Sequence, residues 1–139
     1  MSALPSLLVA ASAAIIFALG AMHLALTFFG QRLDPRDNSL RDRMAEVSPR
    51  LTRETTMWRA WVGFNASHAL GALLFGLLFG YLALAAPALL FGSVFLQVLG
   101  LVTLAAYLLL AVRYWFSRPL WGILAALVLY GLGLLARHV

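Results

Sequence analysis

Two histidines and an asparagine stand in stretches of sequence that are otherwise almost entirely apolar. The segment Trp-Arg-Ala-Trp-Val-Gly-Phe-Asn-Ala-Ser-His, residues 58–68, carries Asn65 and His68, and His23 interrupts an earlier apolar stretch. Burying an amide or an imidazole in hydrocarbon costs about 2 kcal/mol or more unless the group finds a partner. Polar groups inside a membrane span are therefore the first candidates for a functional site.

Helical spacing predicts which of these side chains share a face. At about 100° per residue, one stripe contains Trp58, Trp61, Asn65, His68 and Ala72. His23 and His68 each stand several residues inside the same end of their spans, so we expect the two imidazoles to be neighbours.

Three further residues extend the predicted site. Tyr107, in the third apolar stretch, should lie at a similar depth, while Arg59 and Arg113 would offer positive charge to a phosphate or carboxylate at the mouth. The predicted function is binding of a lipid or an amphipathic small molecule in a polar pocket that faces the cytoplasm. The predicted ligand-binding residues are His23, Arg59, Trp61, Asn65, His68, Tyr107 and Arg113.

Other interpretations of the same residues stay open. The polar side chains could bond only to one another, which contributes about 0.6–2 kcal/mol per contact to helix association. His23 and His68 could hold haem b or a metal ion, because neutral imidazole ligates both. An accessory subunit of a membrane complex, a small dimeric transporter and a lipid-modifying enzyme are further alternatives, although the predicted spans contain no Asp or Glu.

Composition identifies the surroundings in which these residues act. Hydrophobic residues make up 63% of the 139 residues and charged residues 11%, with a mean hydropathy of +0.93, whereas soluble domains are about 25% charged. The ten basic side chains are all arginine and cluster in one connection, which favours membrane topology over nucleic-acid binding. Cysteine is absent, which excludes disulfides and thiolate chemistry.

Four apolar stretches are long enough to cross about 30 Å of hydrocarbon. We expect one all-α transmembrane domain over residues 1–139, an antiparallel four-helix bundle with spans at about 5–29, 58–86, 88–113 and 119–136. The first stretch exceeds a signal-peptide core and lacks a basic leader, so it should be a retained span. The arginines place the connection 30–57 in the cytoplasm and both termini outside. A homodimer or a larger membrane complex stays open.

The connection itself should contain a short amphipathic helix. Ser39 is its predicted cap, and its apolar face would contain Leu40, Met44, Val47 and Leu51. Ser48 followed by Pro49 is typical of a helix start, so the second long helix should begin at Pro49, with Arg50 and Glu54 paired one turn apart.

Small residues in the second span should let helices approach closely. They recur as Gly63, Ser67 and Gly71, and again as Gly76 and Gly80. Pro87 should then produce a tight turn that leads into the third span.

The pattern Trp-x-x-Trp-x-Gly-Phe-Asn-x-Ser-His, together with Met22-His23-Leu24 and Asp34-Pro35-Arg36-Asp37, resembles an uncharacterised family of small bacterial membrane proteins. The resemblance covers most of the chain. It implies a four-span protein of the bacterial inner membrane and carries no established activity, so function must come from the residues themselves.

Overall fold

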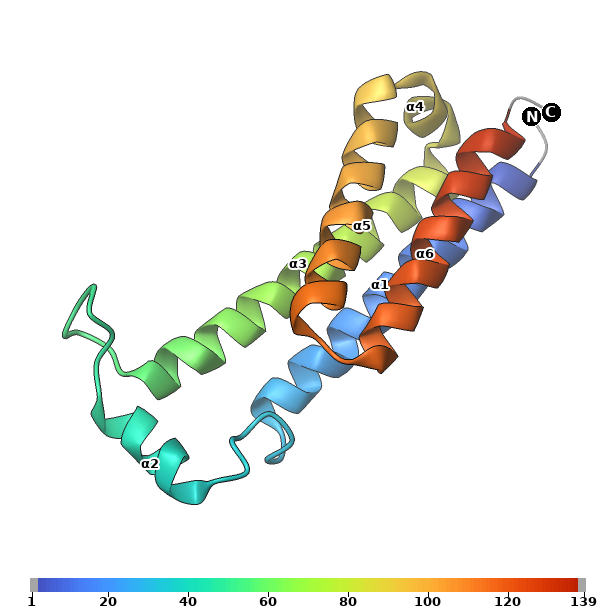
Figure 1. Ribbon diagram of the computed structural model, residues 1–139. Helices are drawn as coiled ribbons and strands as arrows, with labels where there is room; N and C mark the ends of the chain where they lie inside the picture. The colour runs from blue at the N-terminus through green and yellow to red at the C-terminus, as the bar shows by residue number, and fades with distance from the viewer. Residues whose placement is uncertain (1–2, 138–139) are drawn as a thin grey trace. The chain divides into compact units, whose positions relative to one another are not determined.

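The computed structural model describes residues 3–137, and within that range the chain is helical with no strands. Its elements are α1 (Leu4–Phe28), α2 (Asn38–Glu46), α3 (Met57–Ala85), α4 (Pro87–Gly92), α5 (Val94–Tyr114) and α6 (Ser117–Ala136) (Figure 1). Four of them, α1, α3, α5 and α6, are long and apolar enough to span a membrane. The chain is therefore an all-α multi-pass membrane protein, which confirms the predicted fold class.

The described chain divides into two compact units. The bundle unit contains residues 3–19 and 72–137, and the loop unit contains residues 20–71. The division falls within α1, after Leu19, and within α3, after Gly71, so each of these two helices contributes one part to each unit.

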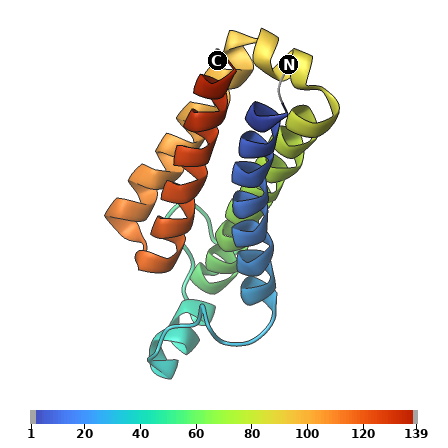
Figure 2. The same cartoon turned by 90° about the vertical axis from the view of Figure 1, so that its right-hand side faces the viewer.

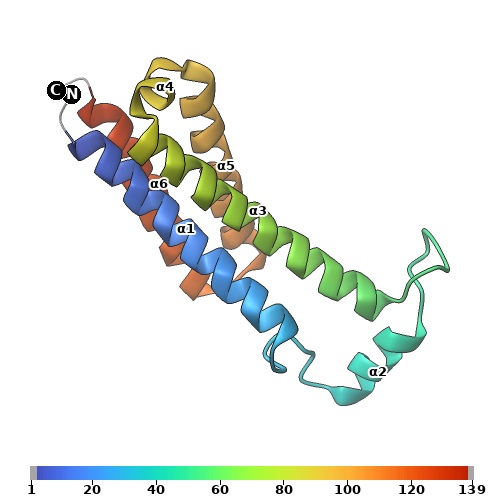
Figure 3. The ribbon, with the colours of Figure 1, turned by 180° about the vertical axis from the view of Figure 1, so that it is seen from behind.

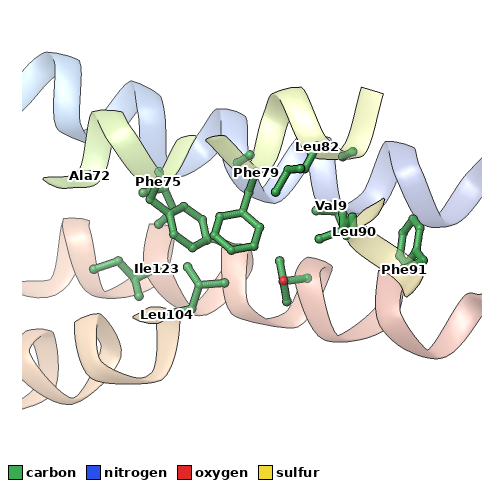
Figure 4. Packing of buried hydrophobic residues seen from close by; sticks show 14 of the residues in the cluster. Val9, Ala72, Phe75, Phe79, Leu82, Leu90, Phe91, Leu104 and Ile123 are labelled. Atoms are coloured by element: carbon green, nitrogen blue, oxygen red, sulfur yellow. The ribbon is translucent and has the colours of Figure 1, made fainter. Parts of the chain in front are cut away.

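The bundle unit is held by close packing between helices. In Figure 2, α5 and α6 lie side by side, joined by a short connection, and the start of α1 lies beside the end of α6. Phe75 stacks on Phe79 (Figure 4), with ring centroids 4.6 Å apart. Phe79 also meets Tyr130 edge-on, with ring centroids 5.7 Å apart. The hydroxyl of Ser12 donates to the carbonyl oxygen of Ala126 at 2.7 Å, which satisfies a fully buried polar group.

The small-residue series of α3 packs closely only in its later part. A Cβ built on Gly76 would lie 2.6 Å from Phe17 Cβ and 2.9 Å from the Ala13 carbonyl oxygen, so α1 and α3 touch there. At Gly63 an added Cβ would meet nothing within 4 Å, and Ser67 and Gly71 are exposed. The prediction that this earlier group forms a helix-packing face is wrong for the structure.

The third span begins later than predicted because a short helix precedes it. Pro87 occupies the first turn of α4, as its missing amide donor favours. The amide of Ser93 then donates to the Leu89 carbonyl, and the Ser93 side chain accepts from Leu96 N, so Ser93 ends α4 and caps α5. The span expected at 88–113 is therefore the pair α4 and α5, of which α5 alone is long enough to cross.

The connection folds differently from its predicted capping pattern. Gly30, just past α1, has a φ of +92°, which only glycine adopts at low cost. Asp37, not Ser39, caps α2. Hydrogen bonds from the hydroxyl and the backbone amide of Ser39 lower the pKa of the Asp37 carboxyl. Since α2 ends at Glu46, Val47 and Leu51 are not part of this helix. The prediction that they share its apolar face with Leu40 and Met44 is therefore wrong.

Helix α3 begins at Met57, so the prediction that it begins at Pro49 is wrong. The carbonyl of Pro49 accepts the amide of Thr52 in a turn, and Thr56 caps the helix by accepting the Arg59 amide at 3.3 Å. The intervening threonines favour turns and caps because their hydroxyls compete for backbone donors. The predicted helical pair of Arg50 and Glu54 is accordingly not formed.

Candidate functional site

The predicted polar residues of α1 and α3 meet inside the loop unit. His23 Nε2 lies 3.0 Å from Asn65 Oδ1, and Asn65 Nδ2 donates to the Trp61 carbonyl at 2.9 Å. The second bond fixes the orientation of the amide, because its nitrogen must face the carbonyl oxygen. Asn65 Oδ1 can only accept, so His23 Nε2 carries the proton and donates it. A directed chain of hydrogen bonds therefore runs from α1 to the backbone of α3.

His68 is the second imidazole of this cluster. Its ring lies edge-on to the His23 ring, with centroids 5.2 Å apart and planes at 85°. The two histidines are thus neighbours, as their shared depth predicts. One turn further along α1, the Thr27 hydroxyl donates to the His23 carbonyl at 2.8 Å. The contacts of His23 with Asn65 and His68 hold the end of α1 against the first half of α3, while the Thr27 bond lies within α1.

A shallow hollow opens beside this cluster, where the connection returns to the start of α3. It is open to solvent, and its volume of about 190 Å³ includes some of that solvent. Its walls combine two indoles, three polar side chains and two aliphatic ones: Trp58, Trp61, Thr27, Asp34, Asn65, Leu33 and Val62. The histidines are not among its lining residues. Asn65 therefore joins the two features, because it borders the hollow and accepts the hydrogen bond of His23.

Two contacts hold the connection against the start of α3 (Figure 3). The indole nitrogen of Trp61 donates to the Leu33 carbonyl at 3.1 Å. The guanidinium of Arg41, on α2, lies 4.8 Å from the ring centroid of Trp58, within the range of a cation–π contact. Both tryptophans thus hold chain segments that precede them. The hydrogen bond of Trp61 fixes the position of Leu33 and Asp34, which form one wall of the hollow.

The remaining predicted residues have other surroundings. Arg59 is exposed on the first turn of α3, and it does not line the hollow. Tyr107 and Arg113 belong to the bundle unit, where both lie on α5. The Tyr107 ring is half-buried and packs 6.4 Å from the Trp115 ring. Arg113 is exposed in the last turn of α5, where a cation complements the partial negative charge of the helix end.

Sequence reasoning missed Leu33, Asp34 and Arg41 as site residues. Asp34 had a recognisable signal, since Asp34-Pro35 predicts a turn, and a turn is what brings a chain back toward the helix it has left. Leu33 accepts the Trp61 hydrogen bond through its backbone carbonyl, and because every residue has a carbonyl, the sequence could not identify this one. The chemistry of Arg41 predicts a cation–π contact with a tryptophan, but the sequence does not show whether Trp58 or Trp61 is the partner.

The cluster is poorly suited to a metal or haem. Among residues 3–137 there is no group of three or more His, Cys, Asp or Glu side chains that could hold a metal ion. The nitrogen by which histidine most often ligates haem is here occupied for His23, because Nε2 donates its proton to Asn65. Ligation through it would require this hydrogen bond to break.

Comparisons with known proteins add no assignment: no protein-family model, no curated protein and no solved structure gives a significant match to this chain.

Proposed function

We propose that this membrane protein binds an amphipathic lipid by its headgroup, with an ammonium group of that headgroup in the hollow between Asp34 and the two indoles. The observation that carries the proposal is the combination of Asp34, Trp58 and Trp61 around one hollow. A carboxylate and aromatic faces are the groups that attract an alkylammonium ion, the first by charge and the second by cation–π interaction.

The size of the hollow supports a fragment rather than a whole ligand. The hollow is shallow, and its volume of about 190 Å³ includes open solvent, so it cannot enclose a whole lipid. It can receive only one small end group of a molecule whose remainder lies elsewhere. A lipid meets this condition, because its acyl chains stay in the bilayer beside α1 and α3.

The charges around the hollow support an ammonium over a simple anion. Asp34 takes part in no ion pair within residues 3–137, whereas Asp42 and Glu46 are paired with Arg41 and Arg43. The Arg41 guanidinium covers one face of the Trp58 indole, so an ammonium in the hollow would meet the other face of that ring or the ring of Trp61. Arg36 and Arg59 are exposed and stand close in sequence to Asp34 and Trp58, and they would hold the phosphate of the same headgroup. A zwitterionic phospholipid combines both charges.

The histidine cluster has a positioning role in this proposal. His23 holds the Asn65 side chain by its oxygen, and the Trp61 carbonyl holds it by its nitrogen. These two bonds fix the orientation of the amide and leave one hydrogen of Asn65 Nδ2 without a role in them. We propose that this hydrogen donates to a headgroup oxygen. Preorganisation of this kind reduces the entropy lost on binding.

The experiment compares lipids that differ only in the headgroup. Thermal unfolding of the purified protein in detergent is followed with added phosphatidylethanolamine or phosphatidylglycerol of matched chains. We expect phosphatidylethanolamine to raise the Tm of the wild type and phosphatidylglycerol to raise it less. Asp34→Asn should remove the difference between the two lipids, while Glu46→Gln, which removes a charge at an exposed carboxylate that does not line the hollow, should preserve it. Equal shifts for both lipids, or a preference that survives Asp34→Asn, would refute the proposal.

We also infer that the loop unit faces the cytoplasm of a bacterial inner membrane and that both termini lie outside. The support is the arginine distribution: seven of the ten, Arg32, Arg36, Arg41, Arg43, Arg50, Arg53 and Arg59, lie between α1 and the first turn of α3. A cysteine replacing the exposed Ala45 on α2 should react with a membrane-impermeant maleimide only after cell lysis. Reaction in intact cells would reverse the orientation.

A further inference from the structure

A closed loop stands between α2 and α3. Its base is the hydrogen bond from Met57 N to the Val47 carbonyl, 2.8 Å long. At its tip the amide of Thr52 donates to the Pro49 carbonyl at 3.3 Å, and the Thr52 hydroxyl accepts from Glu54 N at 3.1 Å. These bonds hold residues 47–57 as one compact loop of the kind that often carries function.

The tip of this loop presents an aliphatic side chain to the surroundings. Leu51 is 95% exposed, more than any other large apolar residue in the range 3–137; the next, Phe29, is 76% exposed. Leu51 is not in a membrane span, so lipid chains along a span do not account for its exposure. An apolar side chain held outward on a hydrogen-bonded turn is unfavourable in water and favourable where apolar surroundings receive it.

Positive charge flanks this leucine on both sides. Arg50 and Arg53 are exposed, and neither takes part in an ion pair within residues 3–137. The loop 47–57 contains two arginines against one carboxylate, that of Glu54. Two free guanidinium groups beside a leucine complement a surface of phosphates above hydrocarbon.

The covalent position of the loop brings it to such a surface. Leu51 is six residues from Met57, where the spanning helix α3 begins, and a fully extended chain of that length reaches at most about 21 Å. The turn and the closed base shorten this reach. Trp58 and Trp61 follow at once, and tryptophans concentrate at the headgroup level of membranes.

From these observations we infer that the loop 47–57 docks on the bilayer that contains the protein. Leu51 enters the headgroup region, while Arg50 and Arg53 bind the phosphates of anionic lipids. The occupant is thus an anionic phospholipid surface. This contact is separate from the hollow beside Trp58 and Trp61, and it does not depend on what the hollow binds.

The absence of cysteine from the sequence makes a direct test simple, because one introduced cysteine is the only labelling site. Leu51→Cys is labelled with a small fluorophore and placed in nanodiscs of phosphatidylcholine, alone or mixed with phosphatidylglycerol, that contain lipids with a quencher near the headgroup. The control, Ala45→Cys, places the label on exposed α2. We expect lipid quenching at position 51, stronger with phosphatidylglycerol, and iodide quenching at position 45.

Removing the charges tests the choice of lipid. Each arginine near an anionic surface favours association about fivefold. The variant Arg50→Gln/Arg53→Gln should therefore lose the response of the position-51 label to phosphatidylglycerol, with an unchanged Tm because both side chains are exposed.

Equal iodide access at positions 51 and 45 in every nanodisc would overturn the inference. Shielding of position 51 in native membranes but not in either nanodisc would also overturn it, because the occupant would then be a protein.

Discussion

The two parts of α3 hold their neighbours by different means. Residues 72–85, in the bundle unit, pack by shape: Phe75 and Phe79 fill the core, and Gly76 admits the backbone of α1. Residues 57–71, in the loop unit, use polar contacts through Asn65 and the two tryptophans. The buried hydrophobic cluster lies wholly in the bundle unit, whereas Ala69 is the buried apolar side chain of residues 20–71.

This difference shows how one helix can serve two purposes. Lipid supplies no hydrophobic force between helices, so they associate by van der Waals packing or by hydrogen bonds. Packing gives a dense unit with little room for a ligand. Hydrogen bonds at separate points leave space between them, and in the loop unit this space is the hollow beside Asn65.

The largest expected effect comes from emptying the packed part of α3. Phe79→Ala removes a ring that contacts Phe75 and Tyr130. We expect a loss of about 2 kcal/mol in the free energy of unfolding, less than the 3–5 kcal/mol of a soluble core, because transfer of the ring to lipid costs little and mainly the cavity remains. Unfolding in mixed micelles of mild detergent and dodecyl sulfate measures it.

The matched control is Phe64→Ala, on the same helix in the loop unit. Phe64 is 74% exposed, so its truncation should leave stability nearly unchanged. Comparable losses for the two variants would mean that the two parts of α3 do not differ in packing.

A second pair of variants adds volume instead of removing it. Gly76→Ala places a methyl group against Phe17 and the Ala13 carbonyl, and backbone atoms cannot rotate away. We expect a net loss of about 1–2 kcal/mol, since overpacking outweighs the better helix propensity of alanine. Gly63→Ala meets no atom within 4 Å and should be neutral or gain up to about 1 kcal/mol. The same unfolding assay applies, and a stabilising Gly76→Ala would contradict the close approach of α1 and α3.

The smallest effect concerns the polar contact of the loop unit. A double-mutant cycle with His23→Ala and Asn65→Ala should give a coupling energy of about 0.6–2 kcal/mol, because the two side chains share a hydrogen bond between helices. The control cycle combines His23→Ala with Ser67→Ala, whose hydroxyl bonds to Phe64 within its own helix. Its coupling should be near zero. If the stability losses of His23→Ala and Asn65→Ala are additive, the hydrogen bond between these two side chains does not stabilise the loop unit.

The accurate predictions are those that depend on many residues at once. The boundaries of α1 and α6, and the length of α3 beyond Trp58, agree with the sequence to within a few residues, because hydropathy sums over many side chains. The neighbouring imidazoles were predictable as well, since depth follows from counting residues along each helix.

The errors lie where single residues compete for the same backbone donors. Ser48-Pro49 and Thr56 are both credible starts for α3. Because Pro49 and Thr52 form a turn, the helix starts after Thr56, which caps it. Ser39 and Asp37 are both credible caps of α2, and Asp37 accepts two bonds from Ser39. Such alternatives differ by little in propensity, so the surrounding structure chooses between them.

Hydropathy and helical spacing are enough to predict four helices that can cross a membrane and to place His23, Asn65 and His68 close together, because lipid tolerates so few residue types that their pattern is plain. The return of the connection to the start of α3 is visible only in the folded chain. Leu33 reaches Trp61 across 28 positions of sequence and brings Asp34 to the hollow. The path of a loop depends on contacts between residues far apart in the chain, whereas hydropathy is a property of residues close together.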